Sequence, residues 1–116
     1  MHNKGILTSF APAGLTKYTI PNSVTSVRDY AFRSCVVLES VIIPNSVKKV
    51  GIMAFTDCKW LKSVYCKATT PPTGGSNMFY NNAPDRKIYV PRNSVEAYKK
   101  AKYWSDYADY IEGYDF

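Results

Sequence analysis

The 116-residue chain has a single histidine, His2, and three cysteines, none of them spaced as Cys-x-x-Cys. Histidine-dependent catalysis needs an imidazole that the fold holds beside a nucleophile, and a residue next to the N-terminus is poorly placed for that. Zinc sites use closely spaced Cys and His ligands, which are missing here. Gly74-Gly75 is too short for a phosphate-binding loop. We therefore expect no enzymatic activity, no catalytic residue, no metal and no cofactor.

Long apolar runs are also missing. Runs such as Val41-Ile42-Ile43 are far shorter than the roughly 20 residues of a membrane-spanning helix. The start of the chain lacks the apolar core of roughly 7 to 15 residues that marks a secretory leader. From the residues alone we expect no transmembrane segment and a cytoplasmic protein, unless a leader has been removed.

Acidic residues are scarce over most of the chain. Residues 1–102 hold all 15 Lys and Arg but only five acids, which gives a net charge of +10, and the last four acids lie within residues 106–115. A basic surface can attract nucleic acid, anionic glycans or acidic proteins. The simpler interpretation is a solvated surface kept soluble by its charge, so nucleic acid and anionic glycan remain alternative partners.

The chain is rich in repetition. Residues 20–41 (IPNSVTSVRDYAFRSCVVLESV) and 43–64 (IPNSVKKVGIMAFTDCKWLKSV) align with a shift of 23 residues and 12 identities in 22 positions. The identical positions are mostly apolar or turn-forming, and most differences fall where a side chain would face water. A period of roughly 20 to 29 residues built on Leu-x-x-Val-x-Ile is typical of leucine-rich repeats, with one short strand in each coil.

Each coil is expected to start with a strand in which alternate residues point inward. The proline after the strand ends it, because proline cannot donate a ladder hydrogen bond. An Asn-Ser turn follows, then a second extended piece that ends at Val27 or Val50. A compact turn closes the coil, and its Ala-Phe pair points a ring into the core.

A degenerate third coil completes the repeats. A loop rich in Pro, Gly and Thr, residues 68–77, replaces the Asn-Ser turn, and Met78-Phe79 takes the place of Ala-Phe. Phe32, Phe55 and Phe79 are therefore expected in one interior file. The repeat predicts four parallel strands, near residues 15–20, 38–43, 61–66 and 86–90.

The period changes after Pro91. Asn93 and Glu96 have the spacing of a capping box, and residues 95–102 include strong helix formers. A helix here would cover the last coil, with Trp104, Tyr107 and Ile111 as apolar anchors. We therefore divide the chain into an N-terminal segment or remnant coil (residues 1–14), repeats (15–91), and a C-terminal helical cap with an acidic tail (92–116).

Cys35 and Cys58 take equivalent positions in successive coils. Their Cα atoms should lie about 5 Å apart, the spacing of neighbouring strands, which permits a disulfide. Side chains in register point the same way, however, so two buried free thiols are the better interpretation. Cys66 falls at an inward strand position and is expected in the core.

The outward side of the strands is the best candidate for a binding surface. Stacking the coils aligns aromatic and cationic side chains, a combination typical of protein-binding hot spots. The same residues also occur on half-exposed sheets that bind nothing. The candidate partner-binding residues are Lys17, Thr19, Glu39, Ile42, Lys62, Tyr65, Lys87 and Tyr89.

The repeated Ile-Pro-Asn-Ser-Val, Ala-Phe, Cys and Leu-x-Ser-Val elements resemble the BspA-like leucine-rich repeats of surface and secreted proteins, notably those of Bacteroidetes. The ending, with Ile88-Tyr-Val-Pro91, Ala97-Tyr98-Lys99 and Trp104, is similar to their usual C-terminal end. The resemblance covers about residues 15–111. It implies a short right-handed α/β solenoid with a C-terminal helical cap. It also implies adhesion or protein binding at the cell surface or outside the cell.

We therefore expect a non-catalytic module that presents its strand face to a host or bacterial surface protein. Two alternatives stay open, namely a basic surface for nucleic acid or anionic glycan, and a structural C-terminal cap of a longer adhesin. The first strand, near residues 15–20, motivates the last alternative. An open sheet edge invites pairing with another coil or with a second copy of the chain.

Overall fold

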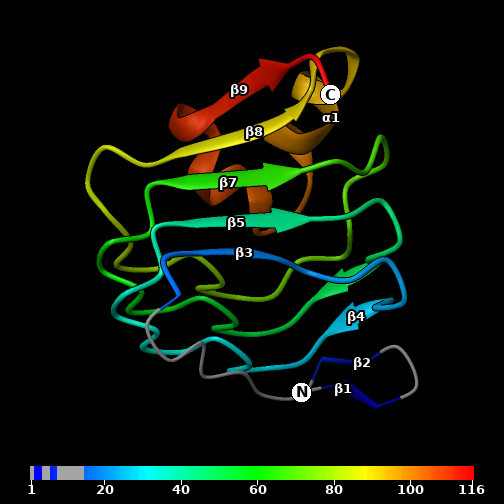
Figure 1. Ribbon diagram of the computed structural model, residues 1–116. Helices are drawn as coiled ribbons and strands as arrows, with labels where there is room; N and C mark the ends of the chain where they lie inside the picture. Colours follow the sequence, from blue (N-terminus) through cyan, green and yellow to red (C-terminus); the bar gives the residue numbers. More distant parts are fainter. Residues whose placement is uncertain (1, 4–5, 8–14) are drawn as a thin grey trace.

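The computed structural model of the protein describes residues 2–3 and 6–7 as strand backbone and residues 15–116 in full. These residues form two sheets of short strands joined by turns (Figure 1). The larger, all-parallel sheet has the order β3 (Lys17–Thr19), β5 (Ser40–Ile43), β7 (Ser63–Cys66), β8 (Lys87–Pro91) and β9 (Ile111–Tyr114). The smaller has the order β1 (His2–Asn3), β2 (Ile6–Leu7), β4 (Ser26–Val27) and β6 (Lys49–Val50).

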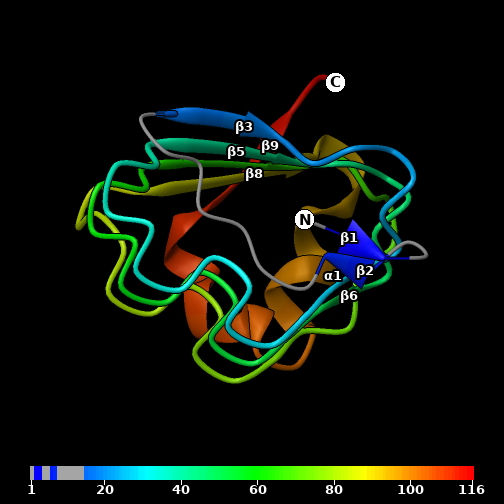
Figure 2. The same cartoon turned by 60° about the horizontal axis from the view of Figure 1, so that its bottom comes forward.

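Successive coils lie in register. The coils of β3 and β5 each place a second strand, β4 or β6, in the smaller sheet, whereas the coil of β7 reaches that sheet only through a bridge between Thr73 and Lys49. β5 pairs with β7 so that Ile42 lies beside Tyr65, and β4 pairs with β6 so that Val27 lies beside Val50. In Figure 2 the turns of successive coils run alongside one another. A parallel sheet built from equivalent positions fits the repeat solenoid that the sequence predicts.

The predicted interior file of phenylalanines is confirmed. Phe32, Phe55 and Phe79 are fully buried. The Phe32 and Phe55 ring centroids are 4.7 Å apart with planes inclined by 14°, and those of Phe55 and Phe79 are 5.4 Å apart with planes inclined by 17°. Such pairs contribute about 0.5 to 1.5 kcal/mol each beyond the burial of their area. Every coil therefore contributes one ring to a continuous core.

The compact turn of each coil hydrogen-bonds to the next coil. The Phe32 N–H donates to the Ala54 carbonyl (2.7 Å), and the Phe55 N–H donates to the Met78 carbonyl (2.8 Å). Each turn also contains two non-glycine residues with positive φ, four positions apart, which is the left-handed region that most side chains avoid. These residues are Tyr30, Ser34, Met53, Asp57, Asn77 and Asn81.

Two glycines allow the backbones of neighbouring coils to approach closely. A Cβ on Gly51 would lie 2.4 Å from the backbone nitrogen of Asp29, and a Cβ on Gly75 would lie 2.4 Å from the nitrogen of Ile52. The obstructing atoms are backbone, so they cannot rotate away. Any side chain at either position would push two coils apart.

The helical cap closes the stack behind β8 and β9 (Figure 1). It consists of the 3-10 helix η1 (Arg92–Ser94), the helix α1 (Val95–Lys100) and the 3-10 helix η2 (Trp104–Tyr110). The rings of Trp104 and Tyr107 contact Phe79, with centroids 5.7 and 5.5 Å away. The predicted anchors therefore extend the aromatic file beyond the last coil.

The same cap holds the irregular loop of the third coil. The Trp104 indole N–H donates to the Pro72 carbonyl (2.7 Å), and the Tyr98 hydroxyl donates to the Ala68 carbonyl (2.6 Å). Both side chains are fully buried, so these bonds also satisfy their polar atoms. The loop lacks the Asn-Ser turn of its predecessors, and the cap supplies the missing support.

The four predicted strands are present as β3, β5, β7 and β8, but the sequence did not predict a further strand in the segment expected to be an acidic tail. Among the described residues the larger sheet has five strands, because β9 pairs in parallel with β8, with Ile111 beside Ile88. The expected tail thus belongs to the sheet, anchored by Ile111, which is buried. β8 also runs through Pro91, whose carbonyl can still accept a ladder bond.

The predicted ends of the strands and of the helix also differ from those observed. β5 starts at Ser40 rather than residue 38 because the Leu38 N–H bonds back to the Cys35 carbonyl in the preceding turn. The capping box is absent: Ser94 is the N-cap, no side chain caps the helix, and the Ser94 hydroxyl donates to the Thr69 carbonyl instead (2.7 Å). The predicted boundaries 1–14, 15–91 and 92–116 remain a prediction, and most of residues 1–14 lie outside the described residues.

We predict that Gly51→Ala lowers the free energy of unfolding by about 1 to 3 kcal/mol, the usual cost of overpacking. The measurement is urea unfolding followed by circular dichroism. Ser23→Ala, at an exposed position, serves as the matched control and should change stability by less than about 0.5 kcal/mol. Equal stability of the two variants would show that the coils are less closely stacked at Gly51 than the structure indicates.

We predict that Ser34→Asn stabilises the fold by about 0.5 kcal/mol, because asparagine tolerates positive φ better than serine. Ser34 has φ 59°, and the equivalent residue two coils later is Asn81, whose amide donates to the Asp57 carboxylate (2.9 Å). The thermal midpoint should rise by a few degrees. Ser34→Val should lower it, since a branched side chain resists this conformation. A lower midpoint for the asparagine variant would refute the prediction.

Candidate partner-binding face

The outer side of the larger sheet carries the residues predicted to bind a partner. The register of β3, β5, β7 and β8 places Thr19 beside Ile42, Ile42 beside Tyr65 and Tyr65 beside Tyr89. The predicted column is therefore confirmed. All eight predicted residues are at least partly exposed, and we call them the strand face: Lys17, Thr19, Glu39, Ile42, Lys62, Tyr65, Lys87 and Tyr89.

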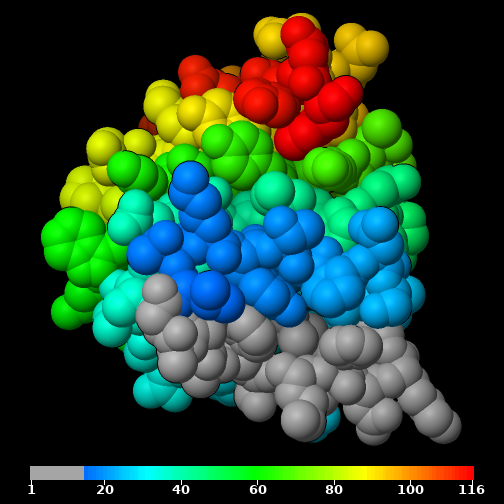
Figure 3. Space-filling view, viewed as in Figure 1, coloured from blue at the N-terminus to red at the C-terminus, as the bar shows by residue number. Residues whose placement is uncertain are grey.

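An aromatic cluster covers the part of this face nearest the C-terminus. The Tyr65 and Tyr89 rings stack, with centroids 4.9 Å apart and planes inclined by 17°. Tyr114 of β9 lies 5.4 Å from each of them, and Phe116 lies 4.8 Å from Tyr114. The C-terminal segment follows the upper rim of the face (Figure 3). Sequence reasoning missed Tyr114 and Phe116, since only the pairing of β9 brings them here.

Two shallow hollows lie on the face. The first has a volume of about 460 Å³ and the second of about 360 Å³. Tyr65 borders both, so the two hollows are neighbours. The polar hollow is lined by Lys17, Glu39, Ser40, Lys62, Ser63 and Tyr65, and the aromatic hollow by Ile42, Tyr65, Lys67, Tyr114, Asp115 and Phe116.

Charge on the face is distributed unevenly. Among the described residues the ion pairs are Lys87 with Glu112 (3.9 Å) and Arg92 with Asp115 (2.8 Å). The Arg92 guanidinium lowers the pKa of the Asp115 carboxyl through its hydrogen bond and charge. Lys17, Lys62 and Lys67 form no ion pair with a described residue, so the β3 to β7 side of the face has an excess of positive charge.

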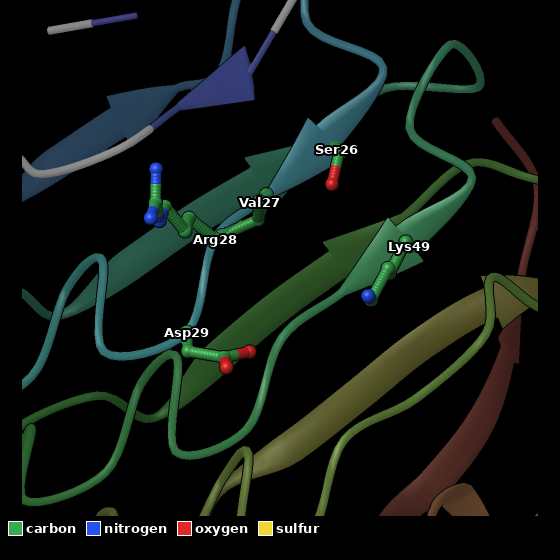
Figure 4. A pocket seen from close by; sticks show the side chains of 5 residues that line it. All are labelled: Ser26, Val27, Arg28, Asp29 and Lys49. Atoms are coloured by element: carbon green, nitrogen blue, oxygen red, sulfur yellow. The ribbon is translucent and has the colours of Figure 1, made fainter.

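A third hollow, of about 260 Å³, lies beside β4 and β6 (Figure 4). The cationic side chains of Arg28 and Lys49 extend in different directions there. The Asp29 carboxylate accepts a hydrogen bond from the Ile52 N–H (2.8 Å) and so joins two coils. We therefore assign Asp29 to the support of the fold. No group of three potential metal ligands occurs within the described residues, and the side chain of His2 lies outside them.

The structure describes all three cysteines as buried free thiols, in agreement with the sequence-based interpretation. The Cys58 thiol donates to the Phe32 carbonyl (3.0 Å), and its contact with Cys35 together with burial raises its pKa. Burial raises the pKa of Cys66 to about 11, and its sulfur lies 3.3 Å from the Tyr98 hydroxyl. These thiols fill the core and face no described hollow.

Comparison with models of protein families shows to which family the chain belongs. A family model described as the BspA type leucine rich repeat region, with six copies, matches residues 7–106. The chain belongs to the BspA-type leucine-rich repeat family. The match spans the coils and most of the cap, and leucine-rich repeats stack into solenoids that present an extended binding surface.

Two further findings concern curated relatives and membrane-spanning helices. No curated protein matches this BspA-type chain. Within the residues that the structure describes, no helix combines the length and the apolar character that crossing a bilayer requires.

We predict that iodoacetamide at pH 8 leaves Cys66 and Cys58 of the folded protein unmodified. With a pKa of about 11, roughly one Cys66 thiol in a thousand is ionised at pH 8, and neither side chain is exposed. Cys35, which is 8% exposed, should react first. Peptide mass spectrometry measures the order, and urea-unfolded protein, in which all three should react alike, is the control. Early labelling of Cys66 would contradict its burial.

Proposed function

We propose that this BspA-type repeat module is a non-catalytic protein-binding domain whose strand face contacts a host or bacterial surface protein, at the cell surface or outside the cell. The observation that carries the proposal is the aromatic cluster of Tyr65, Tyr89, Tyr114 and Phe116 on the exposed side of a rigid sheet. The lysines beside it form no ion pair with a described residue. Tyrosines offer large contact areas at a low entropic cost and are enriched at binding hot spots.

The rigidity of the sheet supports this proposal. The inward residues of the same strands, such as Val64 and Ile88, are fully buried, so the outward residues have fixed positions. The opposite side of β8 is covered by the cap and has no surface to offer, since Tyr98 of α1 is also fully buried there. A surface fixed in this way meets a partner without first having to be ordered.

A polyanion is the second candidate partner, favoured by the excess positive charge at Lys17, Lys62 and Lys67. Nucleic acid and anionic glycans need a continuous basic track. Glu112 and Asp115 interrupt it on the β9 side, which favours a protein. A purely structural role, as the end of a longer adhesin, is a further alternative. It is motivated by β3, which is the last of the described strands on one edge of the larger sheet.

We predict that the double substitution Tyr65→Ser with Tyr89→Ser weakens partner binding by at least about 30-fold, the effect of losing a hot spot. The thermal midpoint should fall by only a few degrees, because both rings are half-exposed. Binding is measured on an array of purified extracellular and bacterial surface proteins, and Tyr80→Ser, an exposed tyrosine in a turn, is the matched control.

If the double variant unfolded, both rings would be part of the core, and this result would contradict the proposal. A folded double variant that keeps every interaction would also contradict the proposal. Binding to a polyanion that falls steeply as salt increases, with no bound protein on the array, would favour the second candidate.

A further inference from the structure

We propose that the strand face recognises an extended acidic peptide segment of its protein partner, with an aromatic or large aliphatic side chain seated in the aromatic hollow and carboxylates beside Lys17 and Lys62. This inference rests on the proposed function and names the kind of partner. Three observations support it: the size and lining of the aromatic hollow, the neighbouring lysines that form no ion pair with a described residue, and the orientation of the tyrosine rings.

The aromatic hollow suits a single apolar side chain. Its volume of about 360 Å³ lies near the lower limit of the roughly 300 to 1,000 Å³ that small-molecule sites have. Ile42, Tyr65, Tyr114 and Phe116 form its walls. Lys67 and Asp115 complete the lining, and Asp115 is held by Arg92 (2.8 Å). One apolar anchor therefore fits, with room for the partner backbone along the rim.

The polar hollow beside it suits carboxylates. Lys17 and Lys62 line it, and Glu39 is its only acid. The hydroxyl groups of Ser40 and Ser63 add donors that can bond to carboxylate oxygens. Since Tyr65 borders both hollows, the anchor and the carboxylates would belong to one short segment. Complementary charge of this kind fixes register and accelerates association.

The orientation of the tyrosine rings argues against bases or sugars as the ligand. Tyr65 and Tyr89 each cover one face of the other ring, with planes inclined by 17°, and Tyr114 lies against both rings. Stacking of a base needs an open aromatic face. Asp115 lines the aromatic hollow itself, so this hollow disfavours any anionic group, and the carboxylates of the peptide are placed in the polar hollow instead. An apolar side chain needs only the hollow and meets neither obstacle.

The test is a selection of random 12-residue peptides, displayed on phage, against the full chain. Binders should carry an aromatic or large aliphatic residue within a few positions of Asp or Glu. As synthetic peptides they should bind at least about tenfold more weakly, by fluorescence anisotropy, to Lys62→Glu and to Tyr114→Ser. The matched controls, Lys100→Glu on α1 and Tyr80→Ser in a turn, should bind like the unmodified chain.

Several results would overturn the inference. Basic binders, binders without an apolar residue, or no binders at all would exclude an acidic peptide with an apolar anchor. So would unchanged affinity of Lys62→Glu, or a sulfated oligosaccharide that binds in a manner sensitive to Lys62→Glu and insensitive to Tyr114→Ser. Non-acidic binders that are lost on Tyr65→Ser with Tyr89→Ser would overturn this inference alone. Binders whose affinity is unchanged by the double substitution would overturn the proposed function as well.

Discussion

The stacking of like positions on like positions is the constraint on which the rest of this structure depends. Phe32 lies against Phe55 and Phe55 against Phe79, while backbone bonds run from each compact turn to the next coil. Gly51 and Gly75 permit this approach because a Cβ at either position would meet backbone atoms at 2.4 Å. A single coil has too little core of its own, so stability and register have the same origin.

The cap that ends this stack also completes the candidate site. Trp104 and Tyr107 cover the last phenylalanine, and the chain then returns to the sheet as β9. That return carries Tyr114 and Phe116 onto the strand face. The need to shield the open end of the core thus determines which side chains surround Tyr65 and Tyr89.

The sequence allowed the interior and the strand columns to be predicted because the 23-residue shift leaves few alternatives. A slip of one residue would expose Val41 and Val64 and bury Ile42 and Tyr65. β9 was missed because Ile-Glu-Gly-Tyr has neither alternation nor a repeated partner, and its pairing depends on the buried Ile111. The capping box failed for a similar reason, since the Ser94 hydroxyl bonds to Thr69 of a distant loop. Tertiary contacts decided both cases, and no local pattern records them.

Residues inside the stack must repeat so that successive coils pack on one another, whereas residues on its outer surface can differ from coil to coil. This difference bears on function. The interior positions are nearly identical in the first two coils, whereas the outer column reads Thr19, Ile42, Tyr65 and Tyr89 in successive strands. The face therefore changes from polar and cationic near β3 to aromatic near β9. The two ends of the column therefore differ in chemistry, even though its last two members are both tyrosines, and a partner that spans the strands meets a polar end and an aromatic end. The repeated interior provides the rigid support, and the varied exterior is where discrimination between partners can arise.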